Sequence, residues 1–315
     1  MFKGKITIIG AGLVGTTTAY TLMLSGLVSE IVLIDKDKNR AEGNALDMNH
    51  GISFVSPVKI IAGDYADIKD SDMVIITAGA NQEPGERRTD LLRKNAKIME
   101  SIVGNVLKYC HDDTIILMVT NPVDILTYVT YKISGFSKNH IIGSGTVLDT
   151  ARLKYLLGEH INIDARNIHT YIIGEHGDSE VAAWSTTSVA GMDIPKFCKS
   201  SEICDTDTIC KNYFYETVKN SAYEIIEKKG ATYYAIALSV KRIVECIIGN
   251  EKSILTVSSM LEGEYGISGM CLAVPTIVSN NGAEKILEID LSDDELRGLE
   301  NSANTLKKLA TEIGY

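Results

Sequence analysis

Three side chains in the second half of the sequence could together move a proton and hold an anion. His176 lies in the polar, glycine-flanked segment Gly174–Asp178, directly after the apolar run 171–173. An imidazole gives or takes a proton near neutral pH, and an arginine guanidinium grips a carboxylate through two parallel hydrogen bonds. Asp149 and Arg152 are three residues apart where a helix is expected to begin, so they share a helix face.

Each of these features also has a simpler explanation. A lone histidine in a turn is more often a surface residue than a catalyst, and Asp149 and Arg152 could form an ordinary ion pair within a helix. In the functional interpretation the two residues have separate tasks. Asp149 orients the imidazole of His176 and favours its charged form, while Arg152 binds a substrate carboxylate.

A glycine-rich segment near the start of the chain predicts a dinucleotide site. Gly10, Gly12 and Gly15 form G-x-G-x-x-G between an apolar run and a helix expected to begin near Leu13, where free backbone amides can bind a pyrophosphate. Asp35 follows Gly15 by twenty residues at the end of the next apolar run. Its carboxylate could bind a ribose and would repel a 2′-phosphate, which favours NAD over NADP. Alone, the loop could be a plain turn and Asp35 a polar strand end.

Two further segments could complete such a site. Residues 77–80, Thr-Ala-Gly-Ala, follow the fourth apolar run and could lie along the cofactor, or could simply end a strand. Residues 81–88 form a polar loop with Pro84 and Gly85 that is typical of a lid. A lid arginine in a closed site would polarise a carbonyl and stabilise its developing negative charge. The charges of this loop could also be merely solvated.

The elements that must position these residues read as an α/β protein. Six apolar, β-branched runs alternate with helical patterns, which predicts buried parallel strands in a doubly wound Rossmann sheet. The runs are 5–10, 30–35, 58–63, 73–79, 114–121 and 140–145. The later part predicts an α+β unit, with helices near 208–228 and 231–248, strands within 254–278 and a helix after Ser292. We therefore expect an NAD-binding domain over 1–145 and a substrate-binding domain over 146–315, with the site between them.

Composition narrows the classes of partner. The 315 residues are 45% hydrophobic and 23% charged, which is typical of a globular protein, and the formal net charge is −10. A negative surface disfavours nucleic acid and anionic membranes, so an anionic substrate must meet locally placed Arg or Lys. The sequence has no signal-peptide pattern and no apolar run of the roughly 18 residues that suggest a membrane span. These features predict a cytoplasmic protein.

The six cysteines do not predict a metal site. They lack a C-x-x-C pair, and the three at 198, 204 and 210 have no histidine or fourth cysteine nearby to complete a ligand set. We therefore expect no metal. Reduced thiols are the expectation for a cytoplasmic chain.

Six ordered motifs make the chain resemble the L-lactate and malate dehydrogenase family from end to end, with the closest likeness to its bacterial L-lactate dehydrogenases. They are GAGLVG (10–15), AGANQEPGERR (78–88), TNPVD (120–124), SGTVLDTAR (144–152), IGEHGDSE (173–180) and KGATYY (229–234). The resemblance implies reversible, NAD-dependent hydride transfer between lactate and pyruvate.

The resemblance also implies roles for single residues. His176 would be the proton donor and acceptor with Asp149 as its partner, and Arg88 would be the lid arginine. The peptide bond between Asn121 and Pro122 would suit the cis form in a tight turn. The implied substrate contacts are Gln82, Arg88, Asn121, Asp124, Arg152 and Thr232. The implied NAD contacts are Gly10, Gly12, Val14, Gly15, Asp35, Gly79, Ala80 and Asn121, with Arg40, Tyr65 and Ser101 as weaker candidates.

Gln82 decides the expected substrate. Malate enzymes of this family carry an arginine at the matching position, which pairs the second carboxylate of their substrate. A neutral glutamine would leave that carboxylate buried and unpaired, at a cost of several kcal/mol, so pyruvate fits better. The alternatives are a malate or bulkier L-2-hydroxyacid dehydrogenase, or a non-catalytic NADH-binding structural protein.

The resemblance further implies a homo-oligomer, usually a tetramer and sometimes a dimer, and raises a possible allosteric site. Bacterial relatives activated by fructose 1,6-bisphosphate use a basic residue and a histidine at a subunit interface. His169 matches the histidine, whereas Lys154 stands where an arginine is usual and binds phosphate only as a point charge. Alternatively, Lys154 is a solvated helix residue and His169 an ordinary strand residue.

Overall fold

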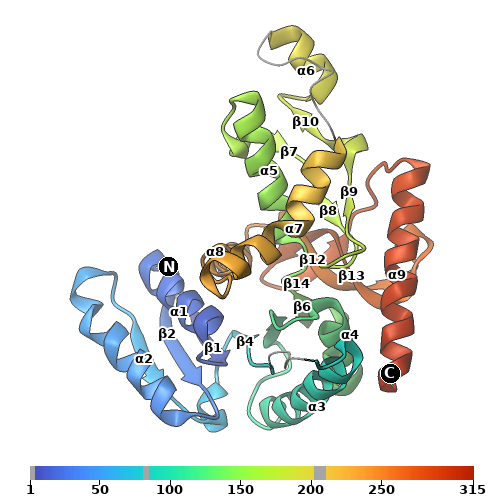
Figure 1. Cartoon of the computed structure of the whole chain (residues 1–315). Coiled ribbons are helices and arrows are strands. Elements are labelled where there is room, and N and C mark those ends of the chain that lie inside the picture. Colours follow the sequence, from blue (N-terminus) through green and yellow to red (C-terminus); the bar gives the residue numbers. More distant parts are fainter. Residues whose placement is uncertain (1–3, 81–84, 202–210) are drawn as a thin grey trace.

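One nine-stranded sheet runs through the molecule and carries most of its other elements (Figure 1). The computed structural model describes residues 4–80, 85–201 and 211–315. In spatial order the strands are β14 (Gly282–Ile286), β13 (Ser268–Ser279), β12 (Ser253–Glu262), β6 (Ile141–Gly143), β5 (Ile115–Met118), β4 (Met73–Ile76), β1 (Gly4–Ile9), β2 (Val28–Ile34) and β3 (Lys59–Ala62).

The six apolar runs of the first half form the six parallel strands that the sequence predicts. All pairs from β3 to β6 are parallel, and every residue of β4 and β5 is buried. The strand order reverses between β1 and β4, which is the switch point where α/β sheets bind ligands. The linking helices are α1 (Leu13–Ser25), α2 (Lys38–His50), α3 (Arg88–Val106) and α4 (Val123–Ser134).

Helices cover both faces of the sheet, so the predicted doubly wound fold is confirmed. One hydrophobic cluster joins the sheet to α3, α4 and the C-terminal helix α9 (Asp293–Ile313). A second cluster joins the other face to α1, α2 and α8 (Tyr234–Ile248). The expected C-terminal helix begins with a capping box, in which Oγ of Ser292 accepts from the amide of Glu295 and Oε2 of Glu295 accepts from the amide of Ser292.

The three long strands of the second half extend the first sheet, whereas its short strands form a three-stranded and a two-stranded sheet of their own. The antiparallel strands β12, β13 and β14 continue beyond β6, where Ser258 pairs with Gly143. The predicted boundary at residues 145 and 146 lies in the short connection from β6 to α5 (Val147–Ile161). The pairing of Gly143 with Ser258 therefore joins the two halves of the chain.

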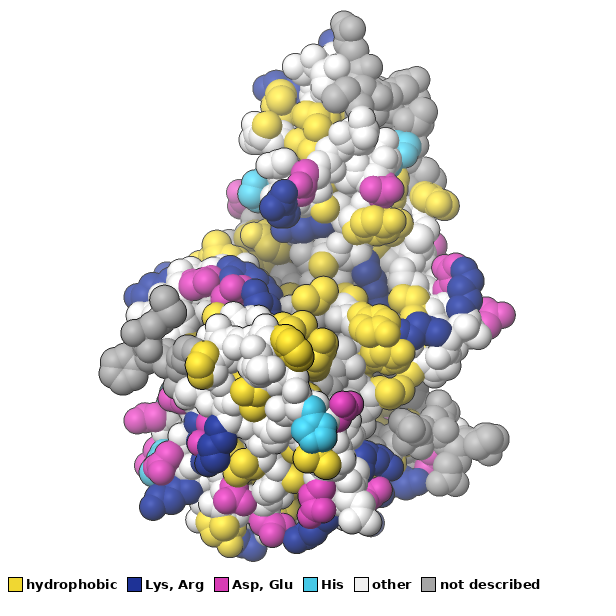
Figure 2. Space-filling model, turned by 90° about the vertical axis from the view of Figure 1, so that its left-hand side faces the viewer, with side chains coloured by type: hydrophobic (Ala, Val, Ile, Leu, Met, Phe, Trp, Pro, Cys, Tyr) yellow, Lys and Arg dark blue, Asp and Glu magenta, His cyan; other side chains and the backbone are white. Residues whose placement is uncertain are grey.

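The helices and short strands that build a third hydrophobic cluster lie above the large sheet in Figure 1. The cluster is built from α5, α7 (Lys211–Lys229), α6 (Ile194–Ser201) and short strands. The short strands are β7 (Ile168–His169), β8 (Ile172–Ile173), β9 (Val181–Ala182), β10 (Ser188–Val189) and β11 (Met192–Asp193). Figure 2 shows this narrower upper part above a body whose surface mixes charges of both signs.

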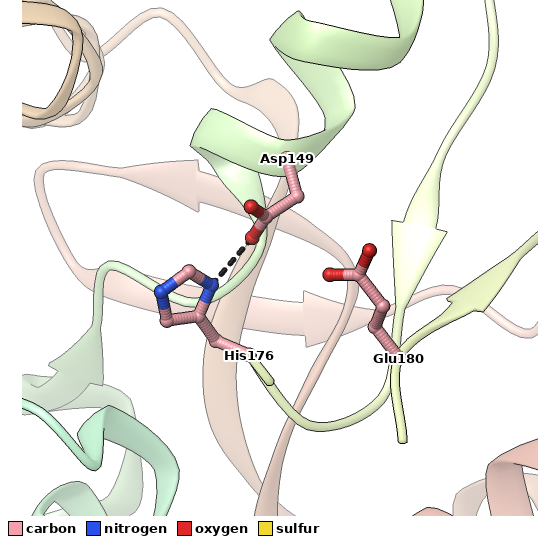
Figure 3. A group of neighbouring side chains, drawn as sticks. All are labelled: Asp149, His176 and Glu180. Carbon is pink, nitrogen blue, oxygen red and sulfur yellow. Dashed lines mark hydrogen bonds and ion pairs between the residues drawn. The ribbon is translucent and has the colours of Figure 1, made fainter. Parts of the chain in front are cut away.

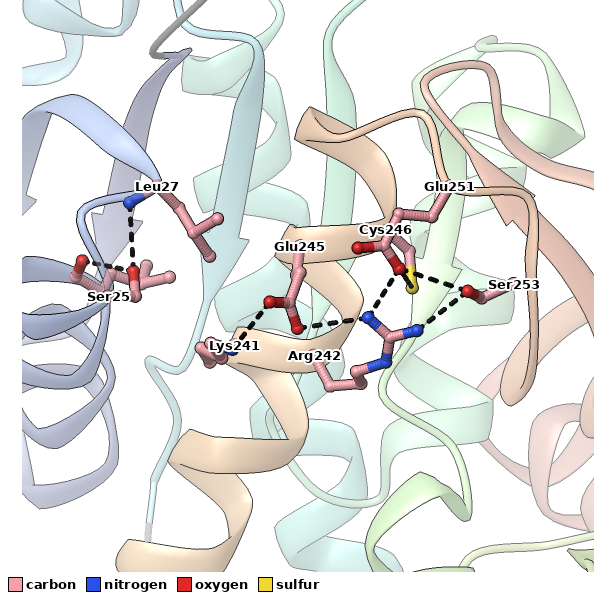
Figure 4. Close-up of polar contacts among 9 residues, drawn as sticks. Ser25, Leu27, Lys241, Arg242, Glu245, Cys246, Glu251 and Ser253 are labelled. Carbon is pink, nitrogen blue, oxygen red and sulfur yellow. Dashed lines mark hydrogen bonds and ion pairs between the residues drawn. The ribbon is translucent and has the colours of Figure 1, made fainter. Parts of the chain in front are cut away.

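A polar cluster fixes the end of α8 to the start of β12 (Figure 4). Nη1 of Arg242 donates to Oε2 of Glu251 at 2.6 Å and to Oε2 of Glu245 at 3.1 Å, and Nη2 donates to Oγ of Ser253 at 2.8 Å. Because α8 also packs on α1, these contacts hold the helix that follows the KGATYY motif in a set orientation.

One expectation about the cysteines is wrong. Cys198 on α6 is disulfide-bonded, whereas Cys110, Cys246 and Cys271 are free thiols as expected. Cys204 and Cys210 lie outside the described residues. The expectation rested on the compartment inferred for the chain, which carries no information about which cysteines the fold brings together. Among the described residues, no helix is long and apolar enough to cross a membrane.

We predict that Gly143→Ala destabilises the protein by about 1–3 kcal/mol, because small-to-large changes at a packed position force the backbone apart. A Cβ atom at this position would lie 2.4 Å from Oγ1 of Thr127 and 2.7 Å from Cβ of Ser258. Denaturant unfolding measures the effect. Gly104→Ala on α3 is the control, since its Cβ would meet nothing within 4 Å, and it should be neutral or slightly stabilising. Equal stability of the two variants would contradict the prediction.

Candidate active site

The glycine-rich loop between β1 and α1 has the close backbone approach that a phosphate cradle requires. Gly10 has φ of 109°, and a Cβ at Gly15 would lie 1.8 Å from the carbonyl oxygen of Gly10. Helix α1 begins at Leu13 as predicted, and its N-cap Gly12 makes no side-chain cap hydrogen bond. Its first amides are therefore available to an anion.

Asp35 connects this loop to the end of β2. Oδ2 of Asp35 accepts from the amide of Ala11 at 2.7 Å, and Oδ1 accepts from the amide of Asp37 at 2.9 Å. A carboxylate has further lone pairs after two such bonds, so Asp35 can still accept hydrogen bonds from a ribose. A direct hydrogen bond therefore joins the glycine loop to Asp35, the acidic residue that the sequence predicts to act with it.

The segment after β4 contacts the same loop, and Asn95 joins that segment to the one after β5. Oγ1 of Thr77 donates to the carbonyl of Gly10 at 2.8 Å. The buried Asn95, which sequence reasoning missed, accepts from the amide of Ala80 at 2.8 Å and donates to the carbonyl of Asn121 at 3.3 Å. The expected cis bond between Asn121 and Pro122 is present. Asn95 therefore ties together two of the predicted cofactor-binding segments.

The weaker cofactor candidates lie at the rim. Arg40 is exposed in the first turn of α2, 3.7 Å from Asp37. Tyr65 follows β3 and is half-buried, and this burial raises its pKa. Ser101 is exposed on α3.

His176, Asp149 and Arg152 meet where the loop after β8 approaches the first turn of α5. Nδ1 of His176 lies 2.5 Å from Oδ2 of Asp149 (Figure 3), and Nη1 of Arg152 lies 2.7 Å from Oδ1 of the same carboxylate. Asp149 is buried, while the side chain of His176 is 24% exposed and that of Arg152 12% exposed. One buried carboxylate thus holds two cationic groups.

Asp149 and Arg152 also form the ion pair expected of residues three apart on a helix. The separate tasks of the two residues in the functional interpretation stay a prediction. The ion pair with Arg152 and the contact with His176 can form at the same time because each uses a different oxygen atom of the Asp149 carboxylate. The contact with Asp149 uses Nη1 of Arg152, which leaves the other guanidinium donors for a substrate carboxylate.

Electrostatics keep the imidazole charged. Burial lowers the pKa of His176, but the charge of Asp149 and the hydrogen bond to it outweigh burial and raise that pKa to about 9. Burial raises the pKa of Asp149, but the charge and hydrogen bond of His176 and those of Arg152 outweigh it and hold that pKa below its usual value. At neutral pH the pair therefore consists of an imidazolium and a carboxylate. The imidazolium can act as a proton donor.

A second buried carboxylate holds the backbone of the histidine. Oδ2 of Asp124 accepts from the amide of His176 at 2.8 Å, and Oδ1 accepts from Oγ of Ser258 at 2.6 Å. Burial raises the pKa of Asp124 to about 6, although these hydrogen bonds oppose the rise. Asp124 was expected among the substrate contacts, yet each of its carboxylate oxygens accepts a hydrogen bond from the protein. Ser258 has no signal in the sequence that could have identified it.

Three further substrate contacts were predicted. Gln82 lies outside the described residues, and so does the side chain of Arg88, although Arg88 begins α3. Thr232 is half-buried between α7 and α8, beside a contact in which Nζ of Lys229 lies 3.5 Å from the ring centroid of Tyr233.

The possible allosteric pair is on neighbouring elements of the upper part. Lys154 is half-buried on α5 and burial lowers its pKa, whereas His169 is exposed on β7. Helix α5 packs against β7. Because Lys154 is half-buried, it is not the solvated helix residue of the simpler interpretation. The phosphate site stays a prediction.

Glu180 completes the surroundings of the histidine. Polar atoms of Glu180, Asp149 and His176 all lie within 4.8 Å of one another (Figure 3). We assign no metal to these residues, because Nδ1 of His176 already binds Asp149 and Arg152 adds a positive charge beside them.

Comparisons with known proteins agree with this organisation. Residues 4–143 match the model of the lactate/malate dehydrogenase NAD binding domain, and residues 146–313 match the alpha/beta C-terminal domain of that family. An L-lactate dehydrogenase of Acetivibrio thermocellus is 60% identical over 97% of this chain and 96% of its own, and L-lactate dehydrogenase 1 of Clostridium acetobutylicum is 57% identical over 98% of both.

Solved structures give the same result. A lactate dehydrogenase from a Medee basin deep-sea metagenome library has a TM-score of 0.95 at 41% identity over the whole of both chains. A minor L-lactate dehydrogenase from Enterococcus mundtii in its ligands-bound form has a TM-score of 0.93 at 40% identity, with 98% of both chains covered.

We predict that Asp35→Asn weakens NADH binding by roughly tenfold, because it replaces a charged hydrogen-bond acceptor by a neutral one. It should also narrow the preference for NADH over NADPH, since it removes the charge that repels a 2′-phosphate. The amide oxygen can still accept from Ala11, so the loop should keep its shape. Fluorescence titration of both nucleotides measures the two affinities. Asp47→Asn removes the same charge from an exposed site on α2 and should leave the preference unchanged. An unaltered preference in Asp35→Asn would contradict the assignment.

Proposed function

The chain belongs to the lactate/malate dehydrogenase family, and from this premise we propose that it is an NAD-dependent L-lactate dehydrogenase that interconverts lactate and pyruvate. The observation that carries the proposal is the single carboxylate of Asp149, which holds a proton donor, His176, next to an anion-binding group, Arg152. A non-catalytic NADH-binding protein would need neither group at this place.

The proposed mechanism assigns one task to each residue. Arg152 binds the carboxylate of pyruvate and orients its C2 carbonyl. NADH, held by the loop of Gly10, Gly12 and Gly15 and by Asp35, would supply the hydride for C2. Because Asp149 engages Nδ1, His176 gives its proton from Nε2 to the C2 oxygen, and Asp149 stabilises the imidazolium before transfer. Lactate oxidation uses the same groups in reverse, with neutral His176 as the base.

The lid residues are assigned from the resemblance. Arg88 would polarise the C2 carbonyl when the lid closes. Gln82 would select pyruvate over oxaloacetate, because it offers no positive charge to a second carboxylate. The alternative is a malate dehydrogenase or a dehydrogenase of bulkier L-2-hydroxyacids. A comparison of substrates distinguishes it from a lactate dehydrogenase.

Assembly and regulation form a further part of the proposal. We infer a cytoplasmic homo-oligomer, expected to be a tetramer. Large hydrophobic side chains are exposed on the neighbouring helices α1 and α8, among them Tyr20, Leu24, Tyr234 and Leu238, and such exposed apolar surface often marks a subunit contact. Lys154 and His169 are the candidate site for fructose 1,6-bisphosphate, in which the lysine would act as a point charge.

The test of the proposed function is NADH oxidation at about 340 nm with pyruvate, oxaloacetate and branched 2-oxoacids, each with and without fructose 1,6-bisphosphate. We expect a strong preference for pyruvate, since the discrimination comes from one buried charge. His176→Ala should lose nearly all turnover yet still bind NADH. Preference for oxaloacetate would overturn the role of Gln82, and turnover unchanged by the bisphosphate would remove the role of Lys154 and His169.

We also predict the pH dependence. Pyruvate reduction needs the imidazolium, so it should fall as pH rises through about 9, the pKa of His176, while lactate oxidation should rise. Asp149→Asn removes the charge that holds this pKa up but leaves the burial that lowers it. The variant should therefore lose reduction at a lower pH, with kcat down by roughly 100-fold or more.

The control for this variant is Asp164→Asn, which removes an equivalent charge from the exposed ion pair with Arg166. Its pH profile should match that of the wild type. An Asp149→Asn enzyme with the wild-type alkaline limit would refute the assigned coupling between the carboxylate and the imidazole.

A further inference from the structure

Glu180 is a buried carboxyl that the mechanism above does not use. The residue is only 4% exposed. It lies four positions after His176, and Figure 3 shows its carboxyl group directed toward His176 and Asp149. Polar atoms of the three side chains lie within 4.8 Å of one another. A charge on Glu180 would therefore act on the imidazole at short range and largely out of water.

The carboxyl of Glu180 differs from the other buried acids around the site. Its Oε1 has no hydrogen-bond partner among the described residues. By contrast, Asp124 and Asp149 use both carboxylate oxygens, and Oε2 of Glu175 accepts from Ser179. A buried carboxyl without a partner is costly as an anion and much less so as a neutral acid.

The backbone places this side chain, so its position does not depend on bonds made by the carboxyl. The hydroxyl of Tyr215 on α7 donates to the carbonyl of Glu180 at 2.7 Å, and the amide of Glu180 donates to the carbonyl of Gly177 at 3.3 Å. Glu180 can therefore gain or lose a proton without losing an anchoring contact.

We propose that Glu180 is a positioning residue of the reaction, whose carboxyl, held beside the His176–Asp149 pair without a partner of its own, sets the pH range over which His176 keeps its transferable proton. The inference rests on the proposed function, because it concerns the same proton.

The charges around Glu180 determine its pKa, and with it the direction in which Glu180 shifts the pKa of His176. Burial, together with the charge of Asp149, raises the pKa of Glu180 to about 8, although the positive charges of His176 and Arg152 oppose the rise. Other titratable groups face this region from the loop between β8 and β9 and from helices α4, α7 and α9. They are Asp178, Asp124, Tyr215, Lys219, Asp294 and Glu295.

The consequence is a carboxyl that is neutral at neutral pH and becomes an anion at mildly alkaline pH. The new anion stabilises the nearby imidazolium, so His176 loses its proton at a higher pH than it would beside a neutral group. Pyruvate reduction, which needs the imidazolium, is extended to higher pH. Lactate oxidation, which needs the neutral ring, is delayed by the same amount.

The test is Glu180→Gln, which keeps the shape and removes the charge. We expect the alkaline limit of kcat/KM for pyruvate reduction to move down by at least about half a pH unit, and the onset of lactate oxidation to move with it. Glu180→Asp should recover part of the shift. Asp294→Asn removes a charge from the exposed rim of the neighbouring pocket and should leave both limits in place.

A readout without turnover separates this inference from the proposed function. Histidine NMR follows the imidazole of His176 with pH in the substrate-free protein, with the signal assigned by its loss in His176→Asn. A lower midpoint in folded Glu180→Gln supports the proposal even if pyruvate is not the substrate, whereas an unchanged midpoint overturns it. Should the glutamine variant not fold, carbon-13 titration of Glu180 in the wild type decides. A midpoint above neutrality supports the proposal, and that of an ordinary glutamate refutes it.

Discussion

Asp149 carries its charge in a nearly fully buried position, and the site is organised around neutralising it. A buried carboxylate is stable only with well-placed cations or donors, and here His176 and Arg152 each take one of its oxygens. The same contact that stabilises Asp149 fixes the ring of His176, keeps it protonated and leaves Nε2 for the substrate. The proton donation and the anion binding that we propose are therefore linked through one side chain, and the loss of its charge is expected to affect both.

The cofactor side depends on the backbone more than on charged side chains. Gly15 lies so close to Gly10 that no larger residue fits without moving the loop, and Asp35 holds that loop through the amide of Ala11. These contacts come from residues next to the carboxyl ends of β1 and β2, where a parallel sheet brings successive connections to one edge. The dinucleotide motif is readable in sequence because its constraints are local.

The sequence could predict the features whose constraints are local in the chain, and it could not predict those that depend on distant contacts. The six parallel strands, the start of α1 at Leu13 and the partnership of His176 with Asp149 depend on periodicity, short spacing or family motifs, and the structure has all of them. The contact of Asp124 with Ser258 spans 134 positions, and the continuation of the sheet from β6 to β12 depends on register. Neither leaves a periodic signal. Asn95 was missed because its importance comes only from burial beside groups distant in the sequence. Glu180, although part of the IGEHGDSE motif, was missed because the sequence does not show that its carboxyl is buried without a partner for Oε1 among the described residues.

The continuous sheet explains how a proton donor from one half meets a cofactor edge from the other. The loop of His176 is held at Gly174 by backbone hydrogen bonds with Ala273 on β13, and at its own amide by Asp124 on α4. Asp124 is in turn held by Ser258 on β12, next to the junction with Gly143. Strands and helices of both halves thus fix the histidine before any substrate binds. Because these contacts fix the histidine without the segment around Gln82, the substrate selection that we propose for Gln82 does not require the proton donor to move.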